Sequence, residues 1–315
     1  MLKILCLVLF TSSTFYAQNS SIDWLNKNVI ALKSDSSNDF SDLKFLSKVL
    51  KDKHIVGLGE ASHGTHEFYL QKSRIIEYLI KEENYKTLAL EATSASIESL
   101  NKFILNGDGD IKTMLKSMGL YNSKEMYDLC VWIMNYNKTK TNNDKFRLVG
   151  IDHEDYWADP YTRDKLMAEN FIAQNSISHR KTIIWSHNLH IAKDTTMAEF
   201  KALGYYINQE FGNKFYAIGF DTYKGNVNVL DNEGQLEKHD FEGSEGTFSS
   251  LFAKVKYQLF FIDFTIANNP LKNEVNKITN LYSNWKTPTP LPVKLGSDFD
   301  GLIFIRKTTA SIGLE

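Results

Sequence analysis

Seven short apolar runs are spaced along the chain, and each is followed by a polar or charged residue. The runs are His54–Gly59, Thr87–Leu90, Phe146–Ile151, Thr182–Trp185, Phe215–Phe220, Gln258–Ile262 and Leu302–Ile305. Helix-like segments lie between them, at Glu67–Glu83, Ser94–Leu105, Ser123–Tyr136, Thr162–Gln174 and Met197–Phe211. This alternation predicts an α/β fold with a mostly parallel central β-sheet flanked by helices. The runs are continuously apolar, which is typical of strands buried on both faces.

The polar residues that follow the strands predict where the functional site lies. In an open parallel sheet, ligands bind outside the carboxyl ends of the strands. Residues at these predicted ends are Glu60, Glu91, Asp152, His153, His187 and Asp221. A single charged residue after a strand is unremarkable, but two glutamates and two histidines on one edge favour an active site there.

Composition and charge favour a globular protein and disfavour a nucleic-acid-binding one. The chain has 315 residues, of which 43% are hydrophobic, and this is typical of a globular protein with a sizeable core. The formal net charge of -2 gives no basic face for a nucleic-acid partner. We find no internal repeat and no linker in the middle of the chain, so residues 18–315 are expected to form one domain that acts on a small molecule.

The first 17 residues resemble a secretory signal peptide. Lys3 supplies a positive charge, Ile4–Phe10 is apolar, and the stretch ends at Ala17, after which we expect cleavage. The apolar run is too short to span a bilayer, so the alternative is a buried N-terminal strand. We therefore expect an exported protein, periplasmic or secreted. Cleavage leaves Cys130 as the single cysteine, and hence no internal disulfide.

The densest motif is the turn Gly59–Phe68, with the sequence GEASHGTHEF. Its glycines permit a tight turn and a close backbone approach. His63 suits the role of a general base, because the ordinary pKa of histidine lies near neutrality. Glu60 or Glu91 can orient its ring. Alternatively, His63 has only a structural role. The neighbouring glutamate and glycines favour the catalytic role instead.

The helix after this turn carries a lysine on its apolar face. Phe68, Lys72, Ile75 and Leu79 are spaced by four, three and four residues, so they share one side. The Lys72 amine then either extends past the apolar residues to water or reaches back to the edge near His63. Arg74 lies off this face, at the surface or in an ion pair.

A second cluster, Trp185–His190, contains two histidines three residues apart, as His63 and His66 are. These histidines with Glu91 could form a metal site; alternatively, only His63 and His187 face inward. No HExxH motif is present, so we favour a site without metal or cofactor.

Other catalytic classes are disfavoured by the sequence. There is no GxSxG motif of a serine hydrolase and no phosphate-binding loop. Cys130 lies in an apolar helix, which disfavours cysteine catalysis.

The ordered motifs resemble the erythromycin esterase family. GEASHGTHEF is followed by TLALEA, FRLVGIDHED, RDKLMAEN, IIWSHNLHI, GYYINQEFGNKFYAIGFDTYKG and DFDGLIFIRK, and together they extend over almost all of residues 18–315. Each piece alone is weak, but the ordered set is specific. The resemblance implies hydrolysis of an ester or lactone, such as the lactone of macrolide antibiotics, without a metal.

The resemblance also implies roles for individual residues. His63 would activate water, Glu60 and Glu91 would orient the histidine, the water or the substrate, and His187 would stabilise the carbonyl oxygen. We assign substrate contacts to Lys72, His66, His190, Asp152 and His153. The family usually has arginine at the position of Lys72, and lysine lacks the two-pronged guanidinium.

One departure from the family concerns the lid. Members that act on macrolides carry a long helical insertion where this chain has only Tyr156–Thr162. Here Tyr156, Trp157 and Tyr161 either form an aromatic wall or pack as a loop. Two alternatives to a metal-free hydrolase stay open: a metal-dependent hydrolase that uses His63 and His187, and a non-catalytic module that binds a small molecule or glycan.

Overall fold

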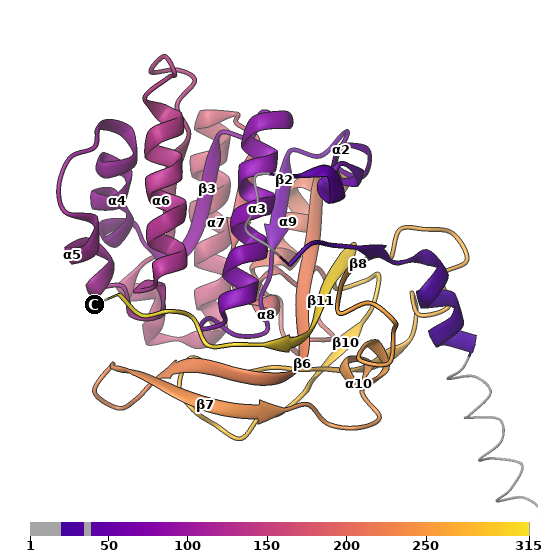
Figure 1. Cartoon of the computed structure of the whole chain (residues 1–315). Helices are drawn as coiled ribbons and strands as arrows, with labels where there is room; N and C mark the ends of the chain where they lie inside the picture. Colours follow the sequence, from indigo (N-terminus) through magenta and orange to yellow (C-terminus); the bar gives the residue numbers. More distant parts are fainter. Residues whose placement is uncertain (1–19, 35–38, 315) are drawn as a thin grey trace, which may run out of the picture.

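The computed structural model describes residues 20–34 and 39–314. The expected signal segment, residues 1–17, lies outside the described residues. No helix within the described ranges has both the length and the apolarity needed to cross a bilayer. The chain forms a mixed sheet with helices on both faces (Figure 1).

Six strands form the parallel centre of the sheet, which confirms the predicted fold class. In spatial order they are β4 (Arg147–Asp152), β3 (Thr87–Thr93), β5 (Thr182–Trp185), β2 (Ile55–Leu58), β6 (Phe215–Leu230) and β11 (Gly301–Thr308). Beyond β11 lie β8 (Leu259–Asp263) and β1 (Ile30–Ala31), each antiparallel to its neighbour. All seven predicted strands are present, but the apolar pattern of β8 could not reveal its reversed direction.

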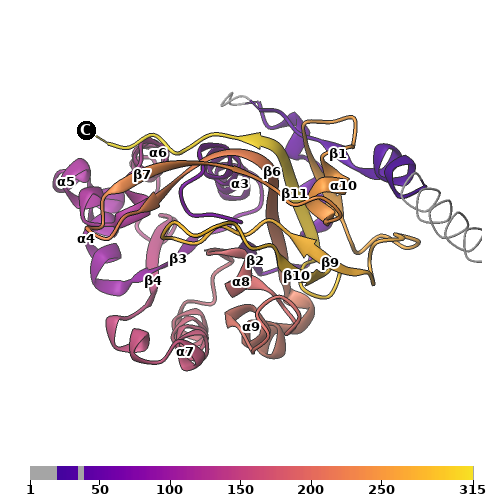
Figure 2. The same cartoon turned by 90° about the horizontal axis from the view of Figure 1, so that it is seen from below.

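The two faces of the sheet bury separate cores. Strand residues alternate between them, so that Val56 joins one core and Ile55 the other. The first core packs under α3 (His66–Glu82), α4 (Ser94–Asn106) and α6 (Lys124–Asn137). The second packs under α7 (Pro160–Ser178) and α9 (Leu203–Phe211) (Figure 2). The predicted helix from Met197 begins later, at Leu203.

The remaining elements are short. They are η1 (Ser41–Leu43), α2 (Phe45–Val49), α5 (Ile111–Lys116), η2 (Gly119–Tyr121), η3 (Glu154–Ala158), α8 (Asn188–Ile191), η4 (Gly212–Lys214), β7 (Leu236–Glu242), α10 (Phe248–Phe252), β9 (Val275–Ile278) and β10 (Leu291–Lys294). Runs this short carry too little periodicity to stand out in the sequence.

The strand order places the carboxyl ends of β2, β3 and β5 side by side. From β2 the chain crosses to β3 and leaves one position between them, which β5 fills later. All three strands are parallel. Their following turns therefore converge on one edge, the place where open α/β sheets bind ligands.

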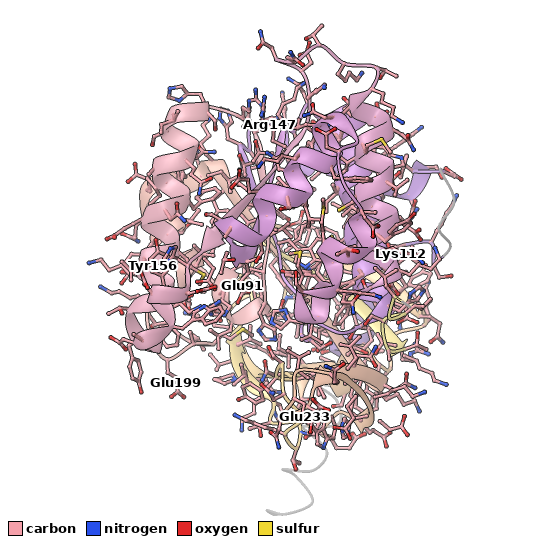
Figure 3. The ribbon with its side chains drawn as sticks, turned by 90° about the vertical axis from the view of Figure 1, so that its left-hand side faces the viewer. Glu91, Lys112, Arg147, Tyr156, Glu199 and Glu233 are labelled. Carbon is pink, nitrogen blue, oxygen red and sulfur yellow. The ribbon has the colours of Figure 1, made fainter. Side chains whose placement is uncertain are left out.

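An antiparallel ribbon covers this edge. β6 continues ten residues past the predicted end at Phe220, and its far half pairs with β7. Leu230 also pairs with Asn284, so the segment after β9 runs alongside the ribbon. In Figure 3, Glu91 lies in the interior between Arg147 at the start of β4 and Glu233 at the ribbon tip.

The ribbon sits against the turn after β2, and Gly64 makes this contact possible. Its carbonyl accepts hydrogen bonds from the N–H groups of Asn228 and Ser311, at 3.0 and 2.9 Å. A β-carbon at Gly64 would lie 1.8 Å from the carbonyl oxygen of Asn228. Only glycine therefore allows the two backbones to approach this closely.

Gly64→Ala should lower the free energy of unfolding by about 2–4 kcal/mol, because the added methyl group forces the ribbon away from the turn. Gly313→Ala is the matched control, since its β-carbon would meet only Leu236 Cδ1 at 3.5 Å. Urea unfolding of both variants measures the difference. Equal stability of the two variants would contradict this account of the ribbon contact.

Candidate functional site

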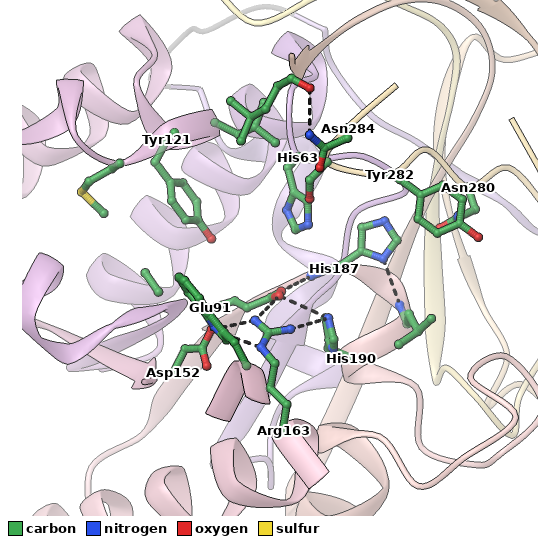
Figure 4. Close-up of a pocket in the computed structure, with 18 residues that line it drawn as sticks. His63, Glu91, Tyr121, Asp152, Arg163, His187, His190, Asn280, Tyr282 and Asn284 are labelled. Carbon is green, nitrogen blue, oxygen red and sulfur yellow. Dashed lines mark hydrogen bonds and ion pairs between the residues drawn. The ribbon is translucent and has the colours of Figure 1, made fainter. Parts of the chain in front are cut away.

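A cavity of about 750 Å³ lies between the carboxyl edge of the sheet and the ribbon (Figure 4). The turns after β2 and β5 contribute His63, His187, Leu189 and His190, and β3 and β4 contribute Glu91 and Asp152. The ribbon side supplies Leu230, Asn280, Tyr282, Ser283 and Asn284, while η2 and the segment before it supply Met118, Gly119, Leu120 and Tyr121. Ala92 of β3, Trp157 of η3 and Arg163 of α7 complete the lining.

Glu60 holds the ring of His63. The Nδ1 atom of His63 lies 2.7 Å from Glu60 Oε1. The other carboxylate oxygen accepts from Lys72 Nζ at 2.7 Å and from Trp185 Nε1 at 3.1 Å. Because a carboxylate oxygen accepts hydrogen bonds, Nδ1 donates in this contact and carries the ring proton. The Nε2 atom of His63 has no hydrogen-bond partner among the described residues and is free for a ligand in the cavity.

Lys72 supports the site from beneath. Its side chain is fully buried on the apolar face of α3, as predicted, and its amine reaches back to Glu60 and lies 4.5 Å from the centre of the Trp185 ring. Burial lowers the pKa of Lys72 to about 8, although Glu60 opposes the shift. Lys72 was expected to contact the substrate, but it does not line the cavity; its amine contacts Glu60, which in turn holds His63.

Glu91 lies at the centre of the cavity floor. Its Oε2 accepts from Ser186 Oγ at 2.7 Å and from the backbone N–H of His187 at 3.0 Å. Its Oε1 faces Arg163 Nη2 at 3.0 Å and His190 Nε2 at 3.2 Å. Burial by itself would raise the pKa of Glu91, but the nearby positive groups, first His190, hold it well below its usual range. Glu91 is therefore a fixed negative charge.

His190 is the positive counterpart of Glu91. Its Nδ1 pairs with Asp164 Oδ1 at 2.8 Å, and its Nε2 pairs with Glu91. Burial opposes protonation, but these two carboxylates raise the pKa of His190 to about 10. The same Asp164 oxygen accepts the N–H of Leu203, which fixes it at the start of α9. His190 thus carries a positive charge at neutral pH.

Asp152 and Arg163 complete the charged floor. Arg163 Nη2 donates to Asp152 Oδ2 at 2.7 Å and Nε donates at 3.2 Å. Trp157 Nε1 donates to the same oxygen at 2.9 Å, which directs this tryptophan toward the cavity. Of the other two aromatic residues of the short segment, Tyr156 packs against the core, whereas Tyr161 is 77% exposed. Of the three aromatic residues, only Trp157 therefore lines the cavity; Tyr156 lies beside it in η3, and Tyr161 lies in the first turn of α7.

His187 is neutral, in contrast to His190. Burial lowers its pKa to about 3, and the neighbouring His63 and His190 act in the same direction. Its Nδ1 accepts the N–H of Leu189 at 3.4 Å, so the ring proton resides on Nε2. That Nε2 is buried and has no partner among the described residues. It is therefore an unused hydrogen-bond donor beside the cavity, with its ring centre 5.0 Å from that of His63.

Three residues predicted at this edge lie elsewhere. His66 is the first residue of α3, and it faces Glu125 of α6 at 2.5 Å, outside the cavity. His153 is half exposed and caps η3 by accepting the N–H of Asp155. Asp221 is inside β6 rather than at its end, and Ser249 and Thr279 donate to it. Only His153 directly follows the end of its strand, whereas His66 begins a helix and Asp221 lies within a strand that is longer than predicted.

Four residues of the site were not identified from the sequence. Arg163 and Asp164 stand in the motif RDKLMAEN and served only to locate that segment. Tyr121 and Asn280 lie in short irregular stretches and line the cavity. The adjacent charges of Arg163 and Asp164 at the start of a helix were a detectable signal, whereas nothing in the local sequence distinguishes Tyr121 or Asn280.

The metal site considered from the sequence is not assembled. Within residues 20–34 and 39–314, no group of three or more His, Cys, Asp or Glu side chains is arranged to hold a metal ion. His66 lies outside the cavity, and both nitrogens of His190 carry protons toward carboxylates. A protonated ring has no lone pair to offer a metal.

Comparison with known proteins identifies the family. The sequence profile described as Erythromycin esterase matches residues 80–159 and 154–308, which is more than half of the chain. The chain belongs to the erythromycin esterase family. The match contains Glu91, Arg163 and His187 but begins after Glu60 and His63.

Individual relatives are more distant. An erythromycin esterase type II of Escherichia coli is 29% identical over 133 residues, which are 41% of this chain. This alignment spans only about a third (31%) of that relative's length. A Bacillus cereus protein of known structure superimposes with a TM-score of 0.83 at 23% identity, covering 95% of this chain and 99% of the other.

A solved variant of the erythromycin esterase EreC in its open conformation also has this fold. It superimposes with a TM-score of 0.68 at 13% identity, over 88% of this chain and 96% of EreC. At such low identity, both structural matches show the shared fold.

The charge on His190 predicts a pH dependence of stability. Its pKa of about 10 in the folded chain exceeds the ordinary value of 6.5, so its contribution is complete below about pH 6.5 and is lost as pH rises toward 10. The gap in unfolding free energy between the wild type and His190→Gln should shrink across this range, by at most about 1.4 kcal/mol per pH unit.

Urea unfolding at several pH values between about 6.5 and 10 measures this gap. The pKa of Lys72 is lowered to about 8, so its contribution to the free energy of unfolding rises with pH above that value. Lys72 is present in both proteins, so this contribution cancels in the difference between them. A gap that stays constant with pH would show that His190 is not charged in the folded protein.

Proposed function

We propose that the protein is a hydrolase of an ester or lactone in which His63 acts as the general base on water. One observation carries the proposal: His63, held by Glu60, presents a free Nε2 to a cavity beside the unpartnered N–H of His187. Ester hydrolysis needs a base for the attacking water and a donor for the oxygen that becomes negative. These two groups meet both needs.

The proposed reaction begins when His63 Nε2 takes a proton from water as its oxygen attacks the acyl carbon. The ring becomes positively charged, and the Glu60 carboxylate stabilises that charge through its contact with Nδ1. Because Lys72 and Trp185 also hold Glu60, the carboxylate cannot rotate away from the ring. When the intermediate collapses, His63 returns its proton to the departing alkoxide.

Direct attack by a side chain is disfavoured. Ser186 Oγ donates its proton to Glu91, and Ser62 Oγ pairs with Thr65, both away from His63. Burial in the helical core raises the pKa of Cys130 to about 12, so its thiol is not activated. Water is then the nucleophile, in accord with a family named for ester hydrolysis.

The lining of the cavity favours an uncharged substrate with apolar parts. Arg163 and His190 are already neutralised by carboxylates. The surrounding wall includes Met118, Leu120, Leu189, Leu230 and Tyr282. A lactone ring or an aliphatic ester suits such a surface. Macrolide lactones are one possible group within this class, and the short segment before α7 leaves more room than a helical lid would.

His63→Ala should lower kcat/KM for hydrolysis by about 10²–10⁴-fold, because the water loses its base. His66→Ala is the matched control: it stands three residues later, outside the cavity, and should keep near wild-type activity. The assay uses a panel of macrolides and simple esters with a chelator present. Turnover that is equal in both variants, or that requires added zinc, would refute the proposed role of His63.

We also propose that the protein is exported, on the strength of the sequence pattern in residues 1–17. Expression of the full chain in a bacterium that recognises such signals should yield a periplasmic or secreted protein whose first residue is Gln18. Cell fractionation and N-terminal sequencing measure this. An uncleaved chain that begins at Met1 and remains in the cytoplasm would contradict export.

A further inference from the structure

Asn280, which lines the cavity, carries a second hydrogen-bond donor without a partner among the described residues. Its side chain is 2% exposed and lines the cavity, and its Nδ2 has no hydrogen-bond partner among the described residues. A buried amide N–H without a partner costs about 1–3 kcal/mol. This donor therefore lowers the stability of the fold rather than raising it. We infer that a bound ligand accepts its hydrogen bond.

The chain on both sides of Asn280 is fixed by hydrogen bonds. The N–H of Thr279 donates to Asp221 Oδ1 at 3.1 Å and to Ser249 Oγ at 2.9 Å. On the other side, the N–H of Leu281 donates to the carbonyl of Ala61 at 2.8 Å. Asn280 therefore stands between two anchored residues, and Asp221, which has no place in the proposed reaction, acquires a positioning role.

Ala61 links the segment of Asn280 to His187, and both residues line the same cavity. The Ala61 carbonyl that accepts from Leu281 lies near the His187 ring, and it tends to raise the pKa of that ring. It does not satisfy the Nε2 proton of His187, which stays unpartnered. In Figure 4, Asn280 and His187 lie on one side of His63, and Tyr121 lies on the other.

We propose that Asn280 is a catalytic residue that shares the acyl oxygen of the substrate with His187. This rests on the proposed ester hydrolysis. Water oxygen bonds to the acyl carbon, its proton passes to His63, and the carbonyl π pair becomes a lone pair on the acyl oxygen. Asn280 Nδ2 and His187 Nε2 each donate a hydrogen bond to that oxyanion. When the pair re-forms the carbonyl, the bond to the alkoxide oxygen breaks and the alkoxide takes the proton from His63.

Amide side chains are common oxyanion donors, and loss of one such donor lowers kcat by about 10²–10³-fold. Asn280→Ala should therefore reduce kcat by this factor on an ester that the wild type hydrolyses, with KM changed less than about threefold. Asn280→Asp, which keeps the shape but replaces the donor with an acceptor, should lose at least as much.

Asn276→Ala is the control from the same segment. Asn276 lies four residues earlier on β9, and its side chain donates to the Gly246 carbonyl at 3.0 Å, away from the cavity. It should keep wild-type kcat. Thermal unfolding of all variants separates misfolding from chemistry. A kcat within about threefold of wild type in folded Asn280→Ala or Asn280→Asp, or a change in KM alone, would overturn the proposal.

A binding experiment separates this proposal from the proposed function. Hexyl methylphosphonate is a stable tetrahedral anion that resembles the intermediate, and calorimetry measures its affinity without turnover. If the wild type hydrolyses no ester, the proposed function fails. In that case at least tenfold weaker phosphonate binding by Asn280→Ala, but not by Asn276→Ala, would still support Asn280 as an oxyanion donor. Equal affinity in all three proteins, or no binding by any, would overturn it.

Discussion

The buried carboxylate of Glu60 is the interaction on which the site depends. Glu60 has no exposure to water, so its charge is tolerated only because His63, Lys72 and Trp185 contact its two oxygens. An isolated buried charge costs several kcal/mol, and loss of one partner leaves the rest uncompensated. These contacts join the turn after β2 to the helix α3 and to the end of β5. The orientation of the His63 ring is therefore tied to the packing of the sheet edge itself.

A second consequence of burial is that two histidines of one motif have opposite charge states. His187 and His190 are three residues apart, yet their pKa values are about 3 and about 10. The difference arises because two carboxylates contact the ring of His190 and outweigh its burial, whereas burial and the neighbouring His63 and His190 outweigh the effect of Glu91 on His187. Glu91 links them, since it pairs with the ring of one and accepts the backbone N–H of the other. The charged groups Glu91 and His190 therefore lie on the cavity floor, whereas the neutral ring of His187 provides a hydrogen-bond donor at the wall.

The ribbon formed by β6 and β7 gives the cavity its other side. It approaches the turn after β2 at Gly64, and the segment after β9 follows it through the contact of Leu230 with Asn284. This antiparallel layer places Asn280 beside the sheet edge although the two are distant in sequence. The short segment at η3 contributes Trp157 to the lining. Most of the wall opposite the sheet edge therefore comes from the ribbon and the segment after β9.

The sequence by itself determined the central strands, the main helices and the sheet edge on which the cavity lies. Strand and helix periods, the turn chemistry of Gly59–Phe68 and the apolar face that carries Lys72 are local properties, so they could be read without the fold. Strand order depends on pairing between distant segments, and no local pattern encodes it. His66 and His190 show the consequence: each follows another histidine by three residues, yet the first begins α3 and turns toward α6, whereas the second faces Glu91. Arg163 and Asn280 likewise became site residues only through tertiary packing, because contacts made across the sheet decide which side chains share one cavity.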